Sequence, residues 1–199
     1  DNGMALVRPP GHHATPDKAM GFCLFNNVAI GARYLQKKYG IAKVLIVDWD
    51  LHHGNGTQDA FYEDPTVLYF SIHQYPHYPG TGSANEKGAG KGAGFTINVP
   101  VMGDTPADEF MKKFRDTLYD KAIEFSPDFI LISAGFDAHK DDPLGNLMLT
   151  EASYAEMTKI ILDIANTCCK GRVLSALEGG YNLHALAMSV EAHLKAMMG

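Results

Sequence analysis

One stretch, residues 44–53, constrains the fold more than any other part of this chain. Val44–Val47 is a continuous apolar run whose β-branched content and length are typical of a buried strand. Asp48, Asp50 and His52 follow at even spacing, so an extended backbone directs all three side chains to one side. This predicts a metal site, because two carboxylates at a buried strand end are costly without a cation. The alternative is a polar loop that caps the strand.

Apolar runs alternate with helical patterns along the chain. The apolar runs are Ala5–Val7, Val44–Val47, Val67–Ile72, Phe129–Ser133 and Val173–Leu177. The helical patterns are Asn26–Tyr39, Pro106–Phe125, Ser153–Cys169 and about Leu183–Met198. Continuous rather than alternating apolar strands are typical of a parallel sheet that is covered on both faces. The sequence therefore predicts the α/β class, a doubly wound parallel sheet with helices on both faces.

Smaller signals refine this prediction. Thr105 is a candidate helix cap, with Pro106 at the first helical position. The glycine-rich segment Pro79–Gly94 predicts a long surface loop that forms part of a site wall. No internal repeat or second domain is visible. We also expect the first helix to turn one face inward, formed by Val28, Ala32, Leu35 and Tyr39.

The composition excludes several classes of protein. Of the 199 residues, 46% are hydrophobic and 20% are charged, which fits one globular domain with a sizeable core. The net charge of −6 does not indicate binding to nucleic acid, and no apolar run is long enough to span a membrane. Cys23, Cys168 and Cys169 cannot form a disulfide framework, which favours a reducing compartment. The first residues are not a signal peptide, and the abrupt start is typical of a fragment.

The ends of the predicted strands carry residues suited to chemistry. After the first apolar run, two prolines and a glycine fix a turn that presents His12 and His13. Asp137 lies just beyond the fourth run, and Glu178-Gly-Gly-Tyr-Asn182 follows the last one. In open α/β sheets, sites assemble outside the carboxyl ends of the strands. One shared site is the economical interpretation, while the alternative for the two histidines is an ordinary surface turn.

Seven motifs, in order, resemble those of the zinc-dependent histone and lysine deacetylases. They are Arg8-Pro-Pro-Gly-His-His-Ala14, Gly21-Phe-Cys23 with Asn26-Asn27, Asp48-x-Asp50-x-His52-His53-Gly54-Asn55-Gly56, Pro79-Gly-Thr-Gly82, Asn98-Val-Pro100, Gly135-Phe-Asp137 and Glu178-Gly-Gly-Tyr181. The resemblance covers nearly the whole chain and is closest to the class II branch and its microbial relatives, which include acetylpolyamine amidohydrolases. The family domain normally begins upstream. We therefore expect residues 1–199 to be a single catalytic domain of the arginase/deacetylase-like fold, without the family's usual N-terminal portion.

The resemblance implies a catalytic zinc site formed by Asp50, His52 and Asp137. Three protein ligands leave positions for water and a substrate carbonyl, as catalytic zinc requires. It also implies that His12 and His13 transfer the protons. His13 resembles the base and His12 its electrostatic partner, although the sequence leaves the division of roles open.

Each of these histidines needs an orienting partner. By resemblance, Asp48 orients His12 and Asn55 orients His13. An amide offers no charge to an imidazolium, so we expect His13 to stay neutral more readily than it would beside a carboxylate. The alternative for Asn55 is an ordinary Asn-Gly turn residue.

The resemblance further implies an oxyanion donor and a substrate tunnel. Tyr181 would donate its hydroxyl to the developing oxyanion, and the alternative is a tyrosine buried in the core. Phe22 and Tyr78 match the aromatic walls of the acyl-lysine tunnel, and Gly21 and Gly179 match residues that line it. Core aromatics are the alternative for the two walls.

Two structural potassium sites are also implied. The first would use Asp48, Asp50, His52, Ser71 and Ile72. The second would use the backbone carbonyls of Phe61, Asp64, Val67 and Phe95. Hard oxygen ligands of this kind suit an alkali cation.

The other histidines test a second interpretation. His139 follows Asp137 at a spacing that resembles the paired ligands of the binuclear arginases, but a further Asp of that pattern is lacking. One metal ion is therefore the better prediction. His73 and His77 are expected on a loop at the mouth of the site. The last two, His184 and His193, are expected to be surface or packing residues.

The predicted function is a zinc-dependent amidohydrolase that removes acetyl or other acyl groups from lysine side chains of proteins. One alternative is an acetylpolyamine amidohydrolase, and another is a catalytically silent module that binds acyl-lysine. The expected partners are acetylated lysine peptides, proteins or polyamines, with no direct contact to nucleic acid or membrane. An intracellular, cytoplasmic location is expected, with the nucleus open in a eukaryote, and the oligomeric state is also open.

Overall fold

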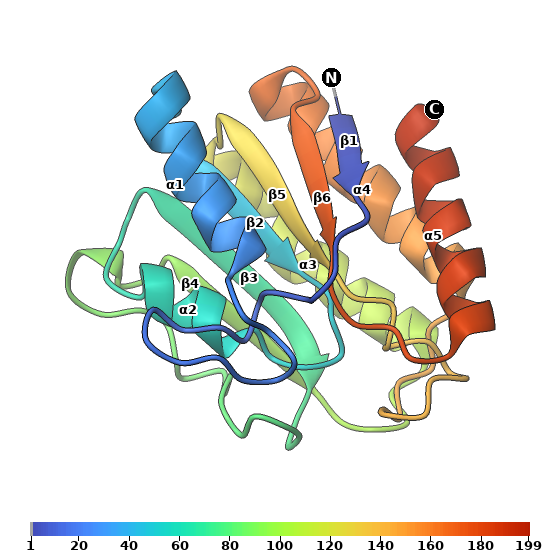
Figure 1. The fold of residues 1–199 in the computed structure, drawn as a ribbon. Helices are drawn as coiled ribbons and strands as arrows, with labels where there is room; N and C mark the ends of the chain where they lie inside the picture. The colour runs from blue at the N-terminus through green and yellow to red at the C-terminus, as the bar shows by residue number, and fades with distance from the viewer. Residues whose placement is uncertain (1) are drawn as a thin grey trace.

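One parallel sheet organises the molecule. The structure is a computed structural model that describes residues 2–199. Its six strands are all parallel and lie in the order β1-β6-β5-β2-β3-β4 (Figure 1). The strands are β1 (Asn2–Ala5), β2 (Val44–Asp48), β3 (Val67–Gln74), β4 (Thr96–Val101), β5 (Phe129–Ala134) and β6 (Val173–Leu177). The prediction of a parallel α/β sheet is confirmed.

Helices cover both faces of the sheet, as predicted. The helices are α1 (Asn27–Tyr39), α2 (Asn55–Phe61), α3 (Ala107–Phe125), α4 (Glu151–Cys169) and α5 (Leu183–Met198), with one 3₁₀ turn at Gly90–Gly92. Helices α3, α4 and α5 pack on one face, and α1 and α2 lie on the other (Figure 1). Strand side chains alternate between these layers, which explains the continuous apolar runs: Leu45 and Val47 join the α3–α4 core, whereas Val44 and Ile46 join the α1 core.

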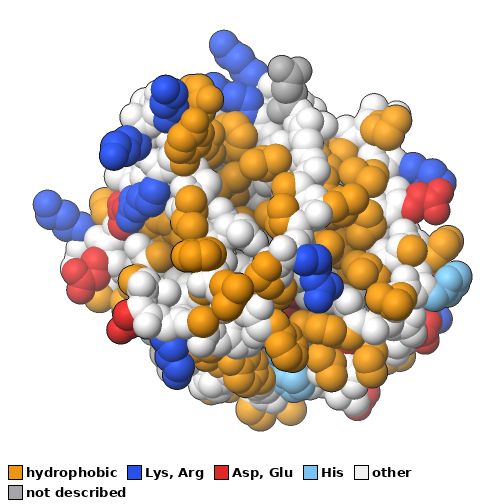
Figure 2. Space-filling model, viewed as in Figure 1, with side chains coloured by type: hydrophobic (Ala, Val, Ile, Leu, Met, Phe, Trp, Pro, Cys, Tyr) orange, Lys and Arg blue, Asp and Glu red, His pale blue; other side chains and the backbone are white. Residues whose placement is uncertain are grey.

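The layer beside α1 is the thinner of the two. Its buried core comprises ten residues, against thirty in the layer of α3 and α4. Leu174 is 39% exposed although it lies on the interior strand β6. Figure 2 shows hydrophobic side chains gathered on this face around α1 and beside β1 and β6. Much apolar surface therefore stays accessible on this side of the sheet.

Three elements differ from the sequence prediction. Strand β4 was not predicted; it is an edge strand, where Pro100 removes no interior hydrogen bond. Helix α2 was also missed, because seven residues beginning with Asn55-Gly56 resemble a turn. Strand β1 lies at Asn2–Ala5 rather than Ala5–Val7, since parallel pairing with β6 overrides the weak strand propensity of its first two residues.

The helix details were partly wrong. Tyr39 is 64% exposed, because it lies in the last turn of α1 beyond the sheet, whereas Val28 and Ala32 are buried as expected. Thr105 does not cap α3: its hydroxyl donates to the carbonyl of Met102, and the helix begins after Pro106. Helix α4 begins two residues earlier than predicted, because Thr150 and Ser153 form a reciprocal capping box.

Two further expectations can be compared with the structure. The segment Pro79–Gly94 is a long loop apart from the single 3₁₀ turn, as predicted. Within residues 2–199, no helix combines the length and apolarity that crossing a bilayer requires. The thiols of Cys23, Cys168 and Cys169 are all free.

Candidate active site

The predicted site residues meet at the carboxyl edge of the sheet, the lower edge in Figure 1. Strand β2 is central, and its last residue, Asp48, pairs in register with Ser71 of β3 and Ser133 of β5. The loops that follow β1, β2, β5 and β6 therefore open at one place. This convergence brings the histidine turn, the Asp/His cluster, Asp137 and Tyr181 together.

Asp50, His52 and Asp137 form a buried group suited to a metal ion. One ligand atom from each lies within 4.8 Å of the others. The Nδ1 atom of His52 is 3.1 Å from Asp50 Oδ1 and 3.0 Å from Asp137 Oδ2. No second group of this kind occurs within residues 2–199. The sequence prediction of these three residues as one cluster is thus matched by the geometry.

Backbone contacts fix the two carboxylates. Asp50 Oδ2 accepts a hydrogen bond from the Gly179 N–H at 2.9 Å, and Asp137 Oδ1 accepts one from the Leu51 N–H at 2.9 Å. A Cβ atom at Gly179 would collide with the Asp137 carboxylate, and one at Gly135 would collide with that of Asp50. Glycine is therefore required at both positions, because the backbone itself forms the wall behind the ligands.

The electrostatics of this group favour a cation between the carboxylates. Burial lowers the pKa of His52, but its hydrogen bonds to Asp137 and Asp50 outweigh this and raise it to about 10. Burial and the nearby charge of Asp50 raise the pKa of Asp137. Without a metal ion, a proton on His52 supplies the positive charge that the two acids demand. A divalent cation at the same point would meet that demand more completely.

The two adjacent histidines have different partners. His12 Nδ1 lies 3.0 Å from Asp48 Oδ2, whereas His13 Nδ1 lies 2.8 Å from the amide oxygen of Asn55. The ring centroids of the two histidines are 4.0 Å apart. Since an amide oxygen only accepts, His13 carries its proton on Nδ1 and keeps Nε2 free to take another.

The charges of the two histidines follow from these partners. Burial lowers the pKa of His12, but Asp50 and Asp48 raise it well above the ordinary value. Burial and the charge of His12 lower the pKa of His13 to about 3. His12 is therefore the charged member of the pair and His13 the neutral one.

Helix α2 holds the histidine turn in place. Asn55 is its first residue, and the backbone N–H of Thr57 donates to the His12 carbonyl at 3.1 Å. A Cβ atom at Gly56 would collide with the backbone of His13 and Ala14. Asn55 is thus part of a helix that packs on the histidines, which rules out the ordinary turn as its whole role.

A cavity of about 480 Å³ opens onto these groups. It is lined by His13, Gly21, Phe22, His52, Tyr78, Leu144 and Tyr181. Phe22 and Tyr78 are 71% and 45% exposed, so they stand at the mouth rather than in the core. Burial and the surrounding carboxylates raise the pKa of Tyr181, which keeps its hydroxyl protonated and able to donate. Gly179, also predicted to line the tunnel, is not among these lining residues; it lies against the carboxylates of Asp50 and Asp137.

Sequence reasoning assigned no role to two supporting carboxylates. Glu178 accepts hydrogen bonds from the N–H groups of Gly11 and His12 at 2.6 and 3.1 Å, so it holds the histidine turn from below. Asp142 accepts a hydrogen bond from the N–H of Tyr181 at 2.7 Å and fixes the turn that carries this tyrosine. Glu178 begins a recognised motif and Asp142 lies five residues after another, but their roles gave no sequence signal, because both contacts join segments distant along the chain.

The remaining histidines divide between mouth and core. The prediction for His73 was wrong: β3 continues to Gln74, and His73 is fully buried. His77 does lie near the site, with its ring centroid 5.2 Å from that of His52. His139 is buried but lies outside the Asp/His/Asp group, consistent with a single metal ion. His193 is a packing residue, as expected.

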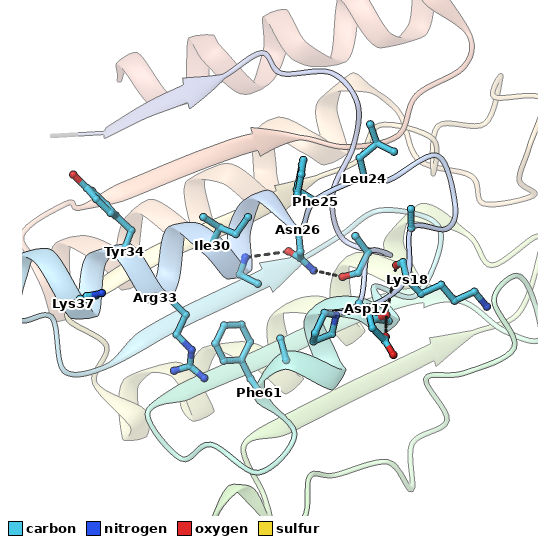
Figure 3. Close-up of a pocket in the computed structure, with 16 residues that line it drawn as sticks. Asp17, Lys18, Leu24, Phe25, Asn26, Ile30, Arg33, Tyr34, Lys37 and Phe61 are labelled. Atoms are coloured by element: carbon cyan, nitrogen blue, oxygen red, sulfur yellow. Dashed lines mark hydrogen bonds between the residues drawn. The ribbon is translucent and has the colours of Figure 1, made fainter.

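A larger groove lies elsewhere, on the outer side of α1. It measures about 720 Å³, and Figure 3 shows Ile30 and Arg33 of α1 beside Phe61 of α2, with Leu24 and Phe25 further along the groove. The guanidinium of Arg33 lies 4.6 Å from the Phe61 ring centroid. None of the predicted catalytic, zinc-binding or tunnel residues lines this groove. The volume of this groove therefore does not identify the candidate active site.

Known proteins are similar to this chain in sequence and in fold. The family described as "Histone deacetylase domain" matches residues 1–197. Histone deacetylase 14, chloroplastic, of Arabidopsis thaliana is 48% identical over 99% of this chain and 47% of its own length. Histone deacetylase 9 of Homo sapiens is 47% identical over 100% of this chain and 20% of its own length.

A solved structure agrees with these matches. The crystal structure of the HDA15 HD domain superposes with a TM-score of 0.95 at 48% identity, covering 100% of this chain and 56% of that one. The chain thus spans about half the length of several proteins that it matches. The matches to histone deacetylase 9 and HDA15 support the class II resemblance. With a family match along nearly its whole length and the predicted site residues gathered at one sheet edge, this chain belongs to the histone deacetylase domain family.

Proposed function

We propose that this chain forms the catalytic centre of a zinc-dependent lysine deacetylase. One observation carries the proposal: His52, which belongs to the group formed with Asp50 and Asp137, lines the same cavity as a neutral imidazole, His13, and a protonated phenol, Tyr181. Amide hydrolysis needs an electrophilic centre, a base and an oxyanion donor within reach of one carbonyl. An intact set of these groups also argues against a silent acyl-lysine binder.

The donor set fits zinc. Two carboxylates and an imidazole are ligands that zinc accepts, and three protein ligands are typical of its catalytic sites. Glycines behind the carboxylates and backbone donors to them hold the set in place. Zinc bound there would supply a Lewis acid that polarises an amide carbonyl and acidifies a water molecule.

The chain's own residues would manage the protons. His13 is neutral and has a free Nε2, so it would accept a proton from water and later return it to the leaving amine. His12, paired with Asp48, would keep a positive charge beside it. Tyr181 would donate its hydroxyl to the oxyanion as the carbonyl is attacked.

The shape of the cavity favours an acylated lysine side chain. Phe22, Tyr78 and Leu144 offer apolar contacts at the mouth, suited to a methylene stem. The family matches favour lysine over acetylated polyamines. Acetylated proteins are therefore the proposed partners. The cytoplasmic location stays a prediction, since one similar protein is named as chloroplastic.

Potassium binding also stays a proposal. Asp48 and Ser71 are register partners on β2 and β3, which supports one ligand cluster that includes Asp50, His52 and Ile72. For the second cluster, the carbonyls of Phe61, Asp64 and Phe95 each accept one backbone hydrogen bond and keep a lone pair. Val67 supplies the fourth carbonyl of that predicted set.

The test is a direct assay of the purified chain with metal analysis. Acetyl-lysine peptides and acetylated polyamines are offered in parallel, and released acetate is measured. We expect turnover of the peptides, one zinc ion per chain, loss of activity with a chelator and recovery with added zinc. Turnover of polyamines alone would favour the alternative amidohydrolase, and two bound manganese ions would reject the zinc proposal.

A further inference from the structure

A loop between β3 and β4 reaches both the cavity and a polar cluster behind it. Tyr78, near the start of this loop, lines the cavity with its ring centroid 5.1 Å from that of His13. The loop has no regular structure between Tyr75 and Ala89. The position of Tyr78 therefore depends on what fixes the residues that follow it.

Glu86 fixes those residues from within the loop. Its carboxylate accepts hydrogen bonds from the N–H groups of Gly82 and Ser83, at 3.0 and 2.9 Å. It also accepts one from Gln58 Nε2 of helix α2 at 2.7 Å. Three donors on one carboxylate tie the loop to itself and to the helix that carries Asn55.

The partners of Glu86 extend into a wider hydrogen-bond network. Gln58 Oε1 accepts from Asn98 Nδ2 at 2.7 Å and from His53 Nε2 at 3.1 Å. His53 Nδ1 in turn accepts from the Thr81 hydroxyl at 2.8 Å. Asn98 Nδ2 also donates to the Glu86 carbonyl at 3.0 Å. Each donor meets an acceptor, so the network specifies one arrangement of the loop.

Close backbone packing completes the attachment. Gly82 accepts a hydrogen bond at its carbonyl from His73 Nε2 at 2.8 Å, and it has a φ of +91°. A Cβ atom there would come within 2.6 Å of the His53 ring. The loop therefore lies directly on two buried histidines, only four residues after Tyr78.

We propose that Glu86 is a positioning residue that anchors this loop, holds Tyr78 at the cavity mouth and thereby sets the affinity for the acyl-lysine substrate. This inference rests on the proposed deacetylase function. Glu86 does not line the cavity, so it takes no part in proton transfer. It acts through the loop, and its loss would weaken substrate binding more than the chemical step.

Two measurements on three variants test this. In Glu86→Ala we expect KM for an acetyl-lysine peptide to rise about tenfold, with kcat within about threefold, as the hydrogen bonds to a charged acceptor are lost. We also expect faster amide hydrogen exchange at Gly82 and Ser83, whose N–H groups lose their acceptor. Glu86→Gln keeps an oxygen acceptor and should recover most of the affinity. Glu63→Ala, at an exposed glutamate just after helix α2, should change neither measurement.

The outcomes separate this inference from the proposed function. Unchanged exchange at Gly82 and Ser83 in Glu86→Ala would overturn the anchoring. Faster exchange with an unchanged KM would overturn the link to substrate binding, as would a loss confined to kcat. If the unmodified chain hydrolyses no acetyl-lysine peptide, the proposed function fails, while hydrogen exchange still decides whether Glu86 anchors the loop.

Discussion

Two buried clusters in this molecule each contain a histidine, His12 in one and His193 in the other. The two histidines differ in charge. At the sheet edge, His12 lies 3.0 Å from the Asp48 carboxylate, and the carboxylates of Asp50 and Asp48 raise its pKa well above the ordinary value despite burial. In the helical layer behind the sheet, His193 forms hydrogen bonds only with hydroxyls, and burial lowers its pKa to about 4. Burial is nearly complete in both places, so the neighbours decide the charge.

The hydrogen bonds show which donors and acceptors meet the polar groups of each cluster. The Thr158 hydroxyl donates to the Tyr154 carbonyl at 2.6 Å, so it accepts from His193 Nδ1, while Ser175 donates to Nε2. The neutral imidazole of His193 therefore has a hydrogen-bond partner at both ring nitrogens. The carboxylates around His12 accept only and need positive charge nearby. Carboxylate neighbours therefore distinguish the charged His12 from the neutral His193, although both are buried.

The largest expected effect follows from removing a carboxylate from the metal group. In Asp137→Asn we expect metal content to fall well below one ion per chain. Activity should drop by more than the roughly 10²–10³-fold lost with a single oxyanion donor. Elemental analysis and turnover measure both. The control is Asp141→Asn, an exposed neighbour on the same loop. Full metal content with full activity in Asp137→Asn would remove this residue from the site.

Tyr181→Phe removes only a hydroxyl from the cavity wall. We expect kcat to fall about a hundredfold with KM nearly unchanged, because the donor acts on charge that develops in the transition state. Steady-state kinetics with matched metal content decide this. Tyr39→Phe, on the exposed end of α1, serves as the control. If only KM rises, Tyr181 binds substrate without stabilising the oxyanion.

Asn55→Asp sharpens the comparison by placing a carboxylate behind His13. A negative charge favours the charged imidazole, so the pKa of His13 should rise from its lowered value of about 3. Since the neutral form is the proposed base, the acidic limb of the pH–rate profile should move to higher pH. Asn85→Asp, in the exposed part of the β3–β4 loop, should leave the limb in place. An unmoved limb in Asn55→Asp would contradict the role of Asn55 behind the base.

His193→Gln tests the other cluster and should have the smallest effect. The folded pKa of His193 is about 4, below the unfolded value of about 6.5, so its stabilising contribution is complete above pH 6.5 and is lost as pH falls toward 4. The loss is up to about 3 kcal/mol in the free energy of unfolding. We expect the free energy of unfolding, measured with urea between pH 7 and 4, to depend less steeply on pH in His193→Gln than in the unmodified chain. The exposed His184→Gln keeps the original slope; an identical slope in both variants would show that His193 does not couple stability to pH.

Much of the fold and the site was predictable, because both depend on short-range patterns. The run Val44–Val47 is apolar at every position, which marks an interior strand of a parallel sheet. Even spacing of Asp50 and His52 beyond that strand placed both on one side, and Asp137 followed a second interior strand. Weak elements were missed, such as β4, where Pro100 and alternating burial obscure the strand.

The sequence by itself determined which side chains reach the carboxyl edge of the sheet, since strand periodicity and strand order along the chain act locally. Only the tertiary structure decided which distant groups support them. Gly179 donates to Asp50 across 129 positions, Glu178 holds the histidine turn across 167, and Glu86 meets Gln58 only where the β3–β4 loop folds back on α2. These contacts carry no periodic signal. They exist because polar groups buried by packing must find partners wherever the fold brings them.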